Sequence, residues 1–314
     1  RTTSAAIVLL SSILYLALLV RVGSIPAFLA YLSGRTTARS EVIANNSGYL
    51  YTAPFWLLGT GLTLIASSSK WNSLQAVAGV SLILLSQAPN IGAGNRSHML
   101  PATISIVVLY YLKSGKRPSK RLWLLAIPAF FTFGLLLPRA VRTQAFTLAT
   151  VLRAARDILL HPGTQMAEFF EGSDTAMLSN LALLVREVPH TLNYAYGLTY
   201  LEALTRAVPR SLWEGKPTEG DLLIMAAIWP DLRAAGTTFT FSIFGEPYYN
   251  FGFFGVAAVL ASFGIGYGGL FHWLLLHSEN SKVQLIFAAC LPYVIVYLRG
   301  GIGVDYQRQL ITLT

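Results

Sequence analysis

The stretch from Asn250 to Leu276 reads NFGFFGVAAVLASFGIGYGGLFHWLLL and contains no Asp, Glu, Lys or Arg. About 20 consecutive apolar residues are enough to cross a bilayer as a helix, so we predict a transmembrane helix here. The whole chain of 314 residues has the same character, because 54% of it is hydrophobic and only 12% is charged, with a mean hydropathy of +0.55. Soluble domains carry charge on about a quarter of their residues. We therefore predict a membrane protein whose surface mostly faces lipid.

Other uncharged apolar stretches predict an all-α polytopic membrane protein, a bundle of about eight visible transmembrane helices. The last helix would be cut short, since the eleven residues from Val304 rise only ~17 Å at 1.5 Å per residue, against a hydrocarbon core of about 30 Å. The chain also begins at Arg1 without a methionine, so we expect that neither end is a natural terminus. The predicted spans cover residues 5–20, 48–67, 73–89, 98–112, 122–138, 250–276 and 283–298, and the truncated one begins near 302.

The loop Lys113–Arg121 sets the orientation of these spans. It has five cations in nine residues, which makes it cytoplasmic by the positive-inside rule. Counting spans outward places residues 139–249 outside, and this segment holds eleven of the fourteen carboxylates and nine cations. We therefore expect N-terminal transmembrane helices in residues 1–138, a large periplasmic or external loop region in 139–249, and C-terminal transmembrane helices in 250–314.

Part of the external segment has amphipathic character. Apolar residues recur at helical spacing between Leu148 and Leu159, and again between Leu178 and Val188. This pattern predicts helices that lie either on the membrane surface or on the helix bundle, and it is compatible with both placements.

Several classes of site are excluded by composition. Cys290 is the only cysteine, so no disulfide framework or cysteine-based metal site is expected. No Asp-x-Asp pair occurs, which argues against metal-dependent use of a nucleotide sugar. The run Gly264–Gly269 lies inside an apolar helix without a strand or a lysine, so close helix packing explains it better than a phosphate loop. We expect no metal, no cofactor and, despite a net charge of +9, no nucleic-acid partner.

Arginine stands at most predicted junctions between a span and the outer face. Its planar fork binds phosphate in a bidentate manner, so the pattern predicts a site for a lipid-borne diphosphate. Two alternatives stay open: these side chains extend to lipid headgroups, or they pair with carboxylates, as Asp305 and Arg308 could one helical turn apart. The candidate diphosphate ligands are Arg96, Arg139, Arg142, Arg210, Lys216, Arg299 and Arg308.

The motif Gly245–Gly252 combines a carboxylate, two tyrosines and an amide where the external segment enters a span. A partly buried carboxylate can act as a general base, and His98 near the outer face is a second candidate base. Aromatic rings with neighbouring polar groups suit a sugar, although an interfacial aromatic belt explains the tyrosines equally well, and His98 could be a polar anchor. The candidate catalytic residues are Glu246 and His98, and the candidate sugar ligands are Tyr248, Tyr249 and Asn250.

The outer motifs resemble those of the Wzy-type polymerases, which polymerise O-antigen and oligosaccharide repeat units in bacterial envelopes. The matching pieces run in order along the chain: Gly94-Asn-Arg96-Ser, Pro209-Arg210 followed by Lys216-Pro217, Glu246-Pro-Tyr-Tyr-Asn-Phe-Gly252 and Arg299-Gly-Gly301.

The resemblance implies a GT-C-like, metal-independent inverting glycosyltransferase of the bacterial cytoplasmic (inner) membrane with its active site on the periplasmic face. Such an enzyme transfers a growing glycan from undecaprenyl diphosphate to a hydroxyl of an incoming lipid-linked repeat unit. Its partners are the polyprenyl-diphosphate-linked oligosaccharide, membrane lipid and a chain-length regulator protein. The resemblance assigns Arg96, Arg210 and Arg299 to the diphosphate, and Glu246 or His98 to the base.

Two other functions fit part of the pattern. An O-antigen ligase would share the hydropathy and the outer arginines. A flippase or transporter of lipid-linked oligosaccharides would place charged groups near the bilayer midplane, whereas the predicted spans are essentially uncharged between their ends. The enzymatic interpretation requires the arginines to gather in one hollow on the outer side.

Overall fold

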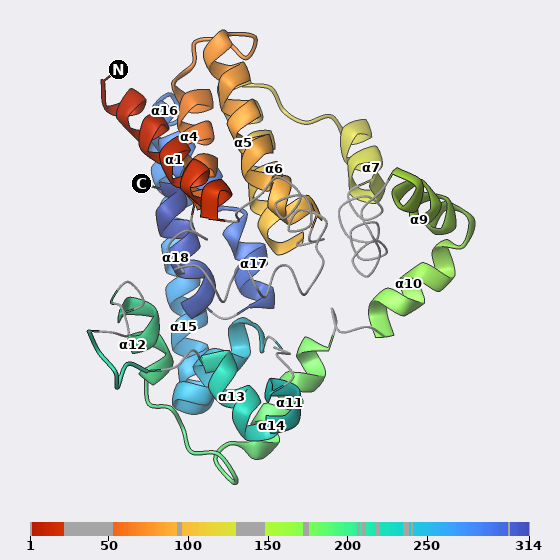
Figure 1. Cartoon of the computed structure of the whole chain (residues 1–314), viewed down its shortest axis with the longest axis vertical. Coiled ribbons are helices and arrows are strands. Elements are labelled where there is room, and N and C mark those ends of the chain that lie inside the picture. The colour runs from red at the N-terminus through yellow and green to blue at the C-terminus, as the bar shows by residue number, and fades with distance from the viewer. Residues whose placement is uncertain are drawn as a thin grey trace. The chain divides into compact units, whose positions relative to one another are not determined.

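The computed structural model describes residues 2–21, 53–92, 96–129, 148–171, 176–205, 208, 212–217, 220–234, 239, 241–300 and 302–313. Throughout these residues the regular structure is helical and no strand occurs, which confirms the all-α prediction (Figure 1). The chain divides into two compact units. Unit 1 comprises Arg1–Glu168, Leu274–Pro292 and Ile311–Thr314, and unit 2 comprises Phe169–Trp273 and Tyr293–Leu310.

Most helices belong to one unit, whereas α10, α15 and α18 pass from one to the other. Unit 1 contains α1 (Thr2–Arg21), α4 (Ala53–Ser67), α5 (Leu74–Gly92), α6 (Arg96–Ser114), α7 (Lys120–Ala129), α9 (Leu148–Leu160) and α16 (Ser281–Cys290). Unit 2 contains α11 (Met177–Glu187), α12 (Leu198–Thr205), α13 (Gly220–Ile228), α14 (Pro230–Ala234) and α17 (Tyr293–Arg299). The helices that change unit are α10 (Pro162–Glu171), α15 (Ser242–Leu276) and α18 (Ile302–Leu313).

Helices α4, α5, α6 and α16 form the core of unit 1. Glycines allow α4 and α5 to approach closely, because a Cβ added to Gly61 would lie 2.6 Å from the carbonyl oxygen of Gly79. Small residues at helix crossings are typical of packing inside membranes. The buried core residues are Leu58, Leu62, Ile65 and Ala66 of α4, Ile83 of α5, Ala102 and Leu109 of α6, and Ala288 and Ala289 of α16.

The side chain of Lys113 caps the C-terminal end of α4. Its Nζ donates hydrogen bonds to the carbonyl oxygens of Ile65 at 2.7 Å, Ala66 at 2.9 Å and Ser68 at 2.6 Å. The last carbonyls of a helix have no partner inside the helix and carry partial negative charge. A cation from the end of α6 therefore stabilises α4 at the edge of the predicted cytoplasmic loop.

The core of unit 2 brings α11, α13 and the start of α15 together. Its buried residues are Leu184, Val188, Ile224, Met225, Phe241 and Tyr248. A second cluster packs Ile243 of α15 against Tyr293, Val296 and Tyr297 of α17. The Tyr297 hydroxyl in turn donates to the side-chain oxygen of Gln309 in α18, so α15, α17 and α18 are connected within this unit.

Helix α15 is two helical segments joined by a break at Phe251 and Gly252. Gly252 has φ 64° and ψ −153°, a backbone conformation that is essentially restricted to glycine. Before the break the helix is mostly buried, and after it apolar side chains such as Phe253, Phe254 and Ile265 are exposed. The break therefore separates a packed segment from an apolar, outward-facing one.

Among the described residues two helical segments are long and apolar enough to cross a membrane, Ser242–Leu276 and Ser281–Arg299. In an apolar 18-residue stretch of each segment, 6% of the residues are buried in the first segment and 56% in the second. Shorter apolar helices, Ala53–Ser67, Leu74–Gln87 and Met99–Ser114, fall on the predicted spans at 48–67, 73–89 and 98–112. The span predicted at 122–138 overlaps α7, and its residues from 130 onward lie outside the described part of the chain.

Candidate functional site

The carboxylate of Glu246 and the amide of Asn250 lie at the end of the first segment of α15. These residues are one helical turn apart, so their side chains share a face of the helix. Both are buried: Glu246 is 6% exposed and Asn250 is 0% exposed. Burial of a carboxylate and an amide requires hydrogen-bond partners, and the segment Tyr194–Tyr200 supplies them.

Thr199 of α12 connects the two side chains. Its hydroxyl donates to Oε1 of Glu246 at 3.0 Å and accepts from Nδ2 of Asn250 at 2.7 Å. Nδ2 of Asn250 also donates to the carbonyl oxygen of Glu246 at 2.8 Å, and Oδ1 accepts from the backbone N–H of Gly197 at 2.8 Å. The two ends of this network come from parts of the chain about fifty residues apart, as the 47-residue separation of Thr199 and Glu246 shows.

The same segment compensates for the break in α15. A helix that stops at Asn250 leaves its last carbonyls without intrahelical partners. The backbone N–H of Ala195 donates to the carbonyl oxygen of Tyr249 at 2.9 Å, and that of Tyr196 donates to the oxygen of Asn250 at 3.2 Å. The break and the network are therefore one structural feature.

Tyr200 lies beside this network with an unused hydrogen-bonding group. Its hydroxyl is buried and has no hydrogen-bond partner among the described residues, while its ring stacks on Phe251 with centroids 6.5 Å apart. Burial raises the pKa of Tyr200 well above its ordinary value, and the nearby Glu246 carboxylate raises it further. At neutral pH the group is therefore a protonated phenol that can donate a hydrogen bond.

The predicted sugar ligands have different environments. The Tyr248 hydroxyl donates to the carbonyl oxygen of Val188 at 3.2 Å, and its ring belongs to the core of unit 2. Asn250 uses its amide inside the network described above. Tyr249 is half-buried, so among the three it has the most accessible side chain.

The predicted cationic ligands fall in several places. Lys216 is buried, and its Nζ donates to the carbonyl oxygen of Val208 at 3.0 Å. Arg299 ends α17 and Arg308 lies in α18, close in sequence to the Tyr297 and Gln309 side chains that join these helices. Arg96 and His98 are in the first turn of α6, where the side chains lie outside the described part, as does that of Asp305. Arg139, Arg142 and Arg210 also lie outside the described residues.

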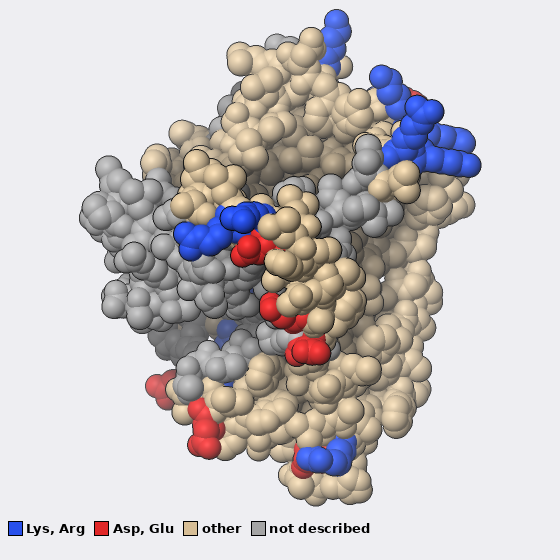
Figure 2. All heavy atoms as spheres, turned by 90° about the vertical axis from the view of Figure 1, so that its right-hand side faces the viewer, with Lys and Arg blue, Asp and Glu red and all other residues tan. Residues whose placement is uncertain are grey.

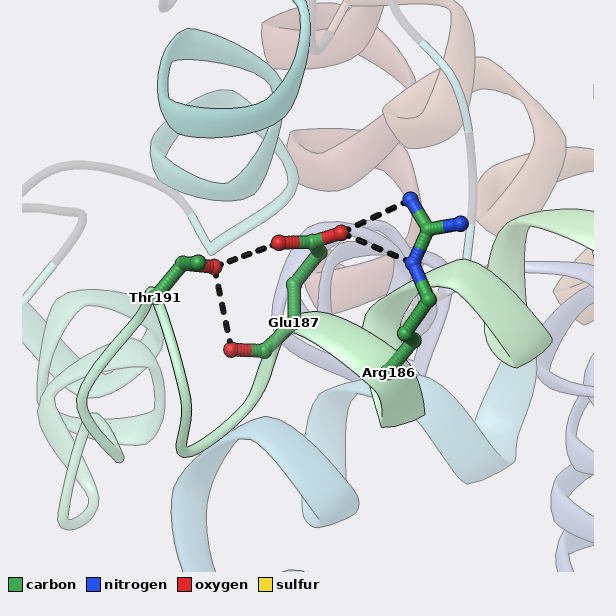
Figure 3. Close-up of polar contacts among 3 residues, drawn as sticks. All are labelled: Arg186, Glu187 and Thr191. Carbon is green, nitrogen blue, oxygen red and sulfur yellow. Dashed lines mark hydrogen bonds and ion pairs between the residues drawn. The ribbon is translucent and has the colours of Figure 1, made fainter.

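One arginine of the external segment does pair with a carboxylate. The Arg186 side chain donates to Oε1 of Glu187 from Nη2 at 2.8 Å and from Nε at 3.0 Å, and Thr191 donates to Oε2 at 2.5 Å (Figure 3). The hydrogen bond from Thr191 lowers the pKa of Glu187 most, followed by that from Arg186. This pair stabilises the turn after α11 and is separate from the Glu246 network.

Sequence reasoning missed Thr199, Tyr200 and Gly197. Gly197 is a signal for a turn, and both it and Tyr196 have positive φ, 91° and 48°. Nothing local, however, links this turn to Glu246. Among the described residues no group of three or more His, Cys, Asp or Glu side chains is arranged to hold a metal ion.

No known protein family, curated protein or solved structure matches this chain.

Proposed function

We propose that this chain is a metal-independent, inverting glycosyltransferase of the bacterial cytoplasmic membrane, an oligosaccharide repeat-unit polymerase of the Wzy type. It would transfer a glycan from undecaprenyl diphosphate to a hydroxyl of a second lipid-linked repeat unit on the outer side of the membrane. The exposed apolar half of α15 supports the membrane location. A bundle of about eight spans is part of the proposal.

The observation that carries the proposal is the pairing of a buried carboxylate with a buried, unpartnered hydroxyl. A polar group left without a hydrogen bond destabilises a fold by about 1–3 kcal/mol, and a role in binding or catalysis is one explanation for keeping such a group. The Tyr200 hydroxyl is in this position next to Glu246. A sugar hydroxyl or a phosphate oxygen of the substrate would give it a partner.

The position of Glu246 also suits a lipid-linked substrate. The carboxylate lies less than two helical turns before the point where α15 becomes exposed and apolar. At that point a helix leaving the membrane would meet the headgroup region, which is where a polyprenyl diphosphate holds its sugar.

The proposed reaction is a displacement at the anomeric carbon. Glu246 accepts the proton of the acceptor hydroxyl as the oxygen bonds to the anomeric carbon, and the bond from that carbon to the diphosphate oxygen breaks. The diphosphate leaves with the bonding electron pair, and its charge is balanced by guanidinium groups. Thr199, which donates to Oε1 of Glu246, holds the carboxylate in position.

Two of the proposed diphosphate ligands, Arg299 and Arg308, belong to helices that are connected within unit 2. Ile243 of α15 packs on α17, which ends at Arg299, and Tyr297 of α17 bonds to α18, which contains Arg308. In the proposal the diphosphate ligands are Arg96, Arg210 and Arg299, and the further candidates from the sequence are Arg139, Arg142, Lys216 and Arg308.

The test is reconstitution of the purified protein in vesicles with an undecaprenyl-diphosphate-linked repeat unit, scored for products longer than one unit. We expect Glu246→Gln to lower the rate by about 10²–10⁴-fold, the usual contribution of a general base. Tyr200→Phe should lower it by about 10–100-fold, since a hydrogen bond to a charged group contributes about 1.5–3 kcal/mol. Because Tyr200 has no structural hydrogen bond to lose, Tyr200→Phe should leave the thermal midpoint unchanged or raised.

Matched controls are available in the same unit. Glu187→Gln changes a carboxylate that is 21% exposed and bonds to Arg186 and Thr191, and Tyr196→Phe removes a hydroxyl from a side chain that is 75% exposed. Both should retain wild-type rates. If the Glu246→Gln variant polymerises at the wild-type rate, Glu246 is not the base. If the Tyr200→Phe variant does so, the contacts around Glu246 and Tyr200 have only a structural role.

The two alternative functions give different products in the same vesicles. A ligase would attach a finished chain to a lipid A core acceptor and would not lengthen the carrier-linked chain. A flippase would move the lipid-linked unit across the bilayer without forming a glycosidic bond. Wild-type protein that does either of these without making longer chains would overturn the polymerase proposal.

A further inference from the structure

The outward face of α9 has a narrow stripe of leucines. Leu148, Leu152 and Leu159 are 74%, 60% and 69% exposed, and at 100° per residue they lie within about 40° of one another around the helix axis. Ala154 and Ile158 face inward and are buried. Helix α9 therefore packs on the protein with one apolar face and presents a second apolar stripe outward.

Two cations stand beside this stripe. Arg153 and Arg156 are exposed, and neither has an ion-pair partner among the described residues. On the helical projection Arg156 lies about 40° beyond Leu152, and Arg153 lies a further 60° or so round the same side. Figure 2, turned so that the right-hand side of Figure 1 faces the viewer, shows Lys and Arg of the described residues in blue in separate groups.

A stripe of leucines flanked by arginines is the pattern of a helix that lies in a membrane interface. If α9 were surrounded only by water, these three leucines would remain exposed to solvent. A bilayer surface with anionic lipids offers both apolar chains for the leucines and phosphate groups for the guanidinium groups.

The chain keeps α9 near the bilayer. Only nine residues, 139–147, separate α9 from the predicted span at 122–138, and nine residues reach at most about 30 Å. This step rests on the membrane location given under the proposed function, and it is independent of the transfer reaction.

We propose that α9 lies along the membrane–water interface on the external side of the cytoplasmic membrane. Leu148, Leu152 and Leu159 would lie among the acyl chains, and Arg153 and Arg156 would bind the phosphates of anionic lipids. The contact holds the external segment against the membrane surface, where a lipid-linked substrate resides. The sequence pattern alone allowed the bundle as a second location, and the exposure of the leucine stripe argues for lipid.

The test uses depth-dependent fluorescence quenching in the full-length chain. Cys290 is the only cysteine and is buried, so Cys290→Ala gives a background for single labels. A fluorophore is placed at Leu152→Cys, and the protein is reconstituted in phosphatidylcholine vesicles with or without phosphatidylglycerol. We expect strong quenching by lipids brominated near the headgroup and little quenching by aqueous iodide.

Two further labels interpret the result. Asp157→Cys lies about 140° around the helix from Leu152 and should be quenched by iodide. Phe254→Cys replaces a side chain of α15 that is 81% exposed and should be quenched by brominated lipid. If the Phe254 label meets lipid but the Leu152 label meets water or is shielded from both quenchers, the proposal for α9 is wrong while the membrane location stands. If neither label meets lipid, the membrane location itself fails, and the α9 proposal fails with it.

The charge part of the proposal has its own variant. In the labelled chain with both arginines present, phosphatidylglycerol should increase the quenching of the Leu152→Cys label by brominated lipid. In the double variant Arg153→Gln with Arg156→Gln this increase should disappear, with the helical circular dichroism unchanged. An increase of the same size in the double variant would show that the arginines do not bind the anionic lipid.

Discussion

Replacing Gly252 by alanine tests whether the break in α15 is required by the fold. With φ 64° and ψ −153°, the residue occupies a region where an L side chain introduces about 1–3 kcal/mol of strain. The added Cβ would also lie 3.2 Å from the Tyr194 hydroxyl oxygen and 3.5 Å from Cε1 of the same ring. At about 2–4 °C per kcal/mol for a chain of this size class, Gly252→Ala should lower the thermal midpoint by roughly 2–12 °C.

The matched control is Gly264→Ala, on the same helix. No atom lies within 4 Å of a Cβ added there, and alanine is more stable than glycine in a helix interior by about 0.5–1 kcal/mol. The two substitutions should therefore shift the midpoint in opposite directions, as followed by helical circular dichroism in detergent. If Gly252→Ala melts at or above the wild-type temperature, the fold does not require the positive φ at the break, and the break and the Glu246 network are not one structural feature.

Three further predictions concern single polar contacts. Lys113→Met should lower the thermal midpoint by the equivalent of about 1.5–3 kcal/mol, because three carbonyl oxygens at and just after the end of α4 lose a charged donor. Lys116→Met, in the exposed loop, should change the midpoint little. Equal effects of the two substitutions would contradict the stabilising role of Lys113. Asn250→Ala should lower the free energy of unfolding by about 1–3 kcal/mol, since the partly buried N–H of Gly197 loses its acceptor, and an unchanged thermal midpoint would count against the network. Thr191→Val should raise the pKa of Glu187 toward its ordinary value, as read by carboxyl NMR titration. Because the folded pKa is lowered, the stabilisation is present above the ordinary carboxyl pKa and is lost as pH falls through the folded value, so wild type and variant should converge in acid and diverge at neutral pH.

The sequence was sufficient to predict the class of the fold and the places of several helices. Low charge and long apolar stretches predict helices because a helix satisfies its own backbone hydrogen bonds without water. The apolar stretches at 48–67, 73–89 and 98–112 accordingly fall on α4, α5 and α6. A full set of about eight spans stays a prediction.

The break in α15 illustrates what periodicity does not show. Gly252 and Gly264 are both glycines in one apolar run, and only Gly252 adopts a positive φ. The difference arises from the segment Tyr194–Gly197, whose backbone N–H groups replace the lost helical bonds. That pairing joins residues more than fifty positions apart, and a single sequence contains no local signal for it.

The candidate site was identified in part for the same reason. Glu246 stood out because a carboxylate is rare next to a span, but its partner Thr199 is an ordinary residue of an amphipathic segment. Asn250 was interpreted as a sugar ligand, whereas in the structure it connects Thr199, Gly197 and the backbone of Glu246. An amide beside a carboxylate has the same appearance in a sequence whether it faces a ligand or the protein.

The same contacts allow a structural and a chemical role for the Glu246 network to be separated. A network that only supports the break in α15 needs every polar group in it to be paired, because each unpaired group destabilises the fold. Thr199 and Asn250 obey this requirement, but the buried hydroxyl of Tyr200 does not. A phenylalanine at position 200 would serve the fold as well or better, since it would keep the stacking on Phe251 and remove the unpaired group. Loss of transfer activity in Tyr200→Phe without loss of stability would therefore assign the hydroxyl to substrate, and it would do so independently of any variant of Glu246.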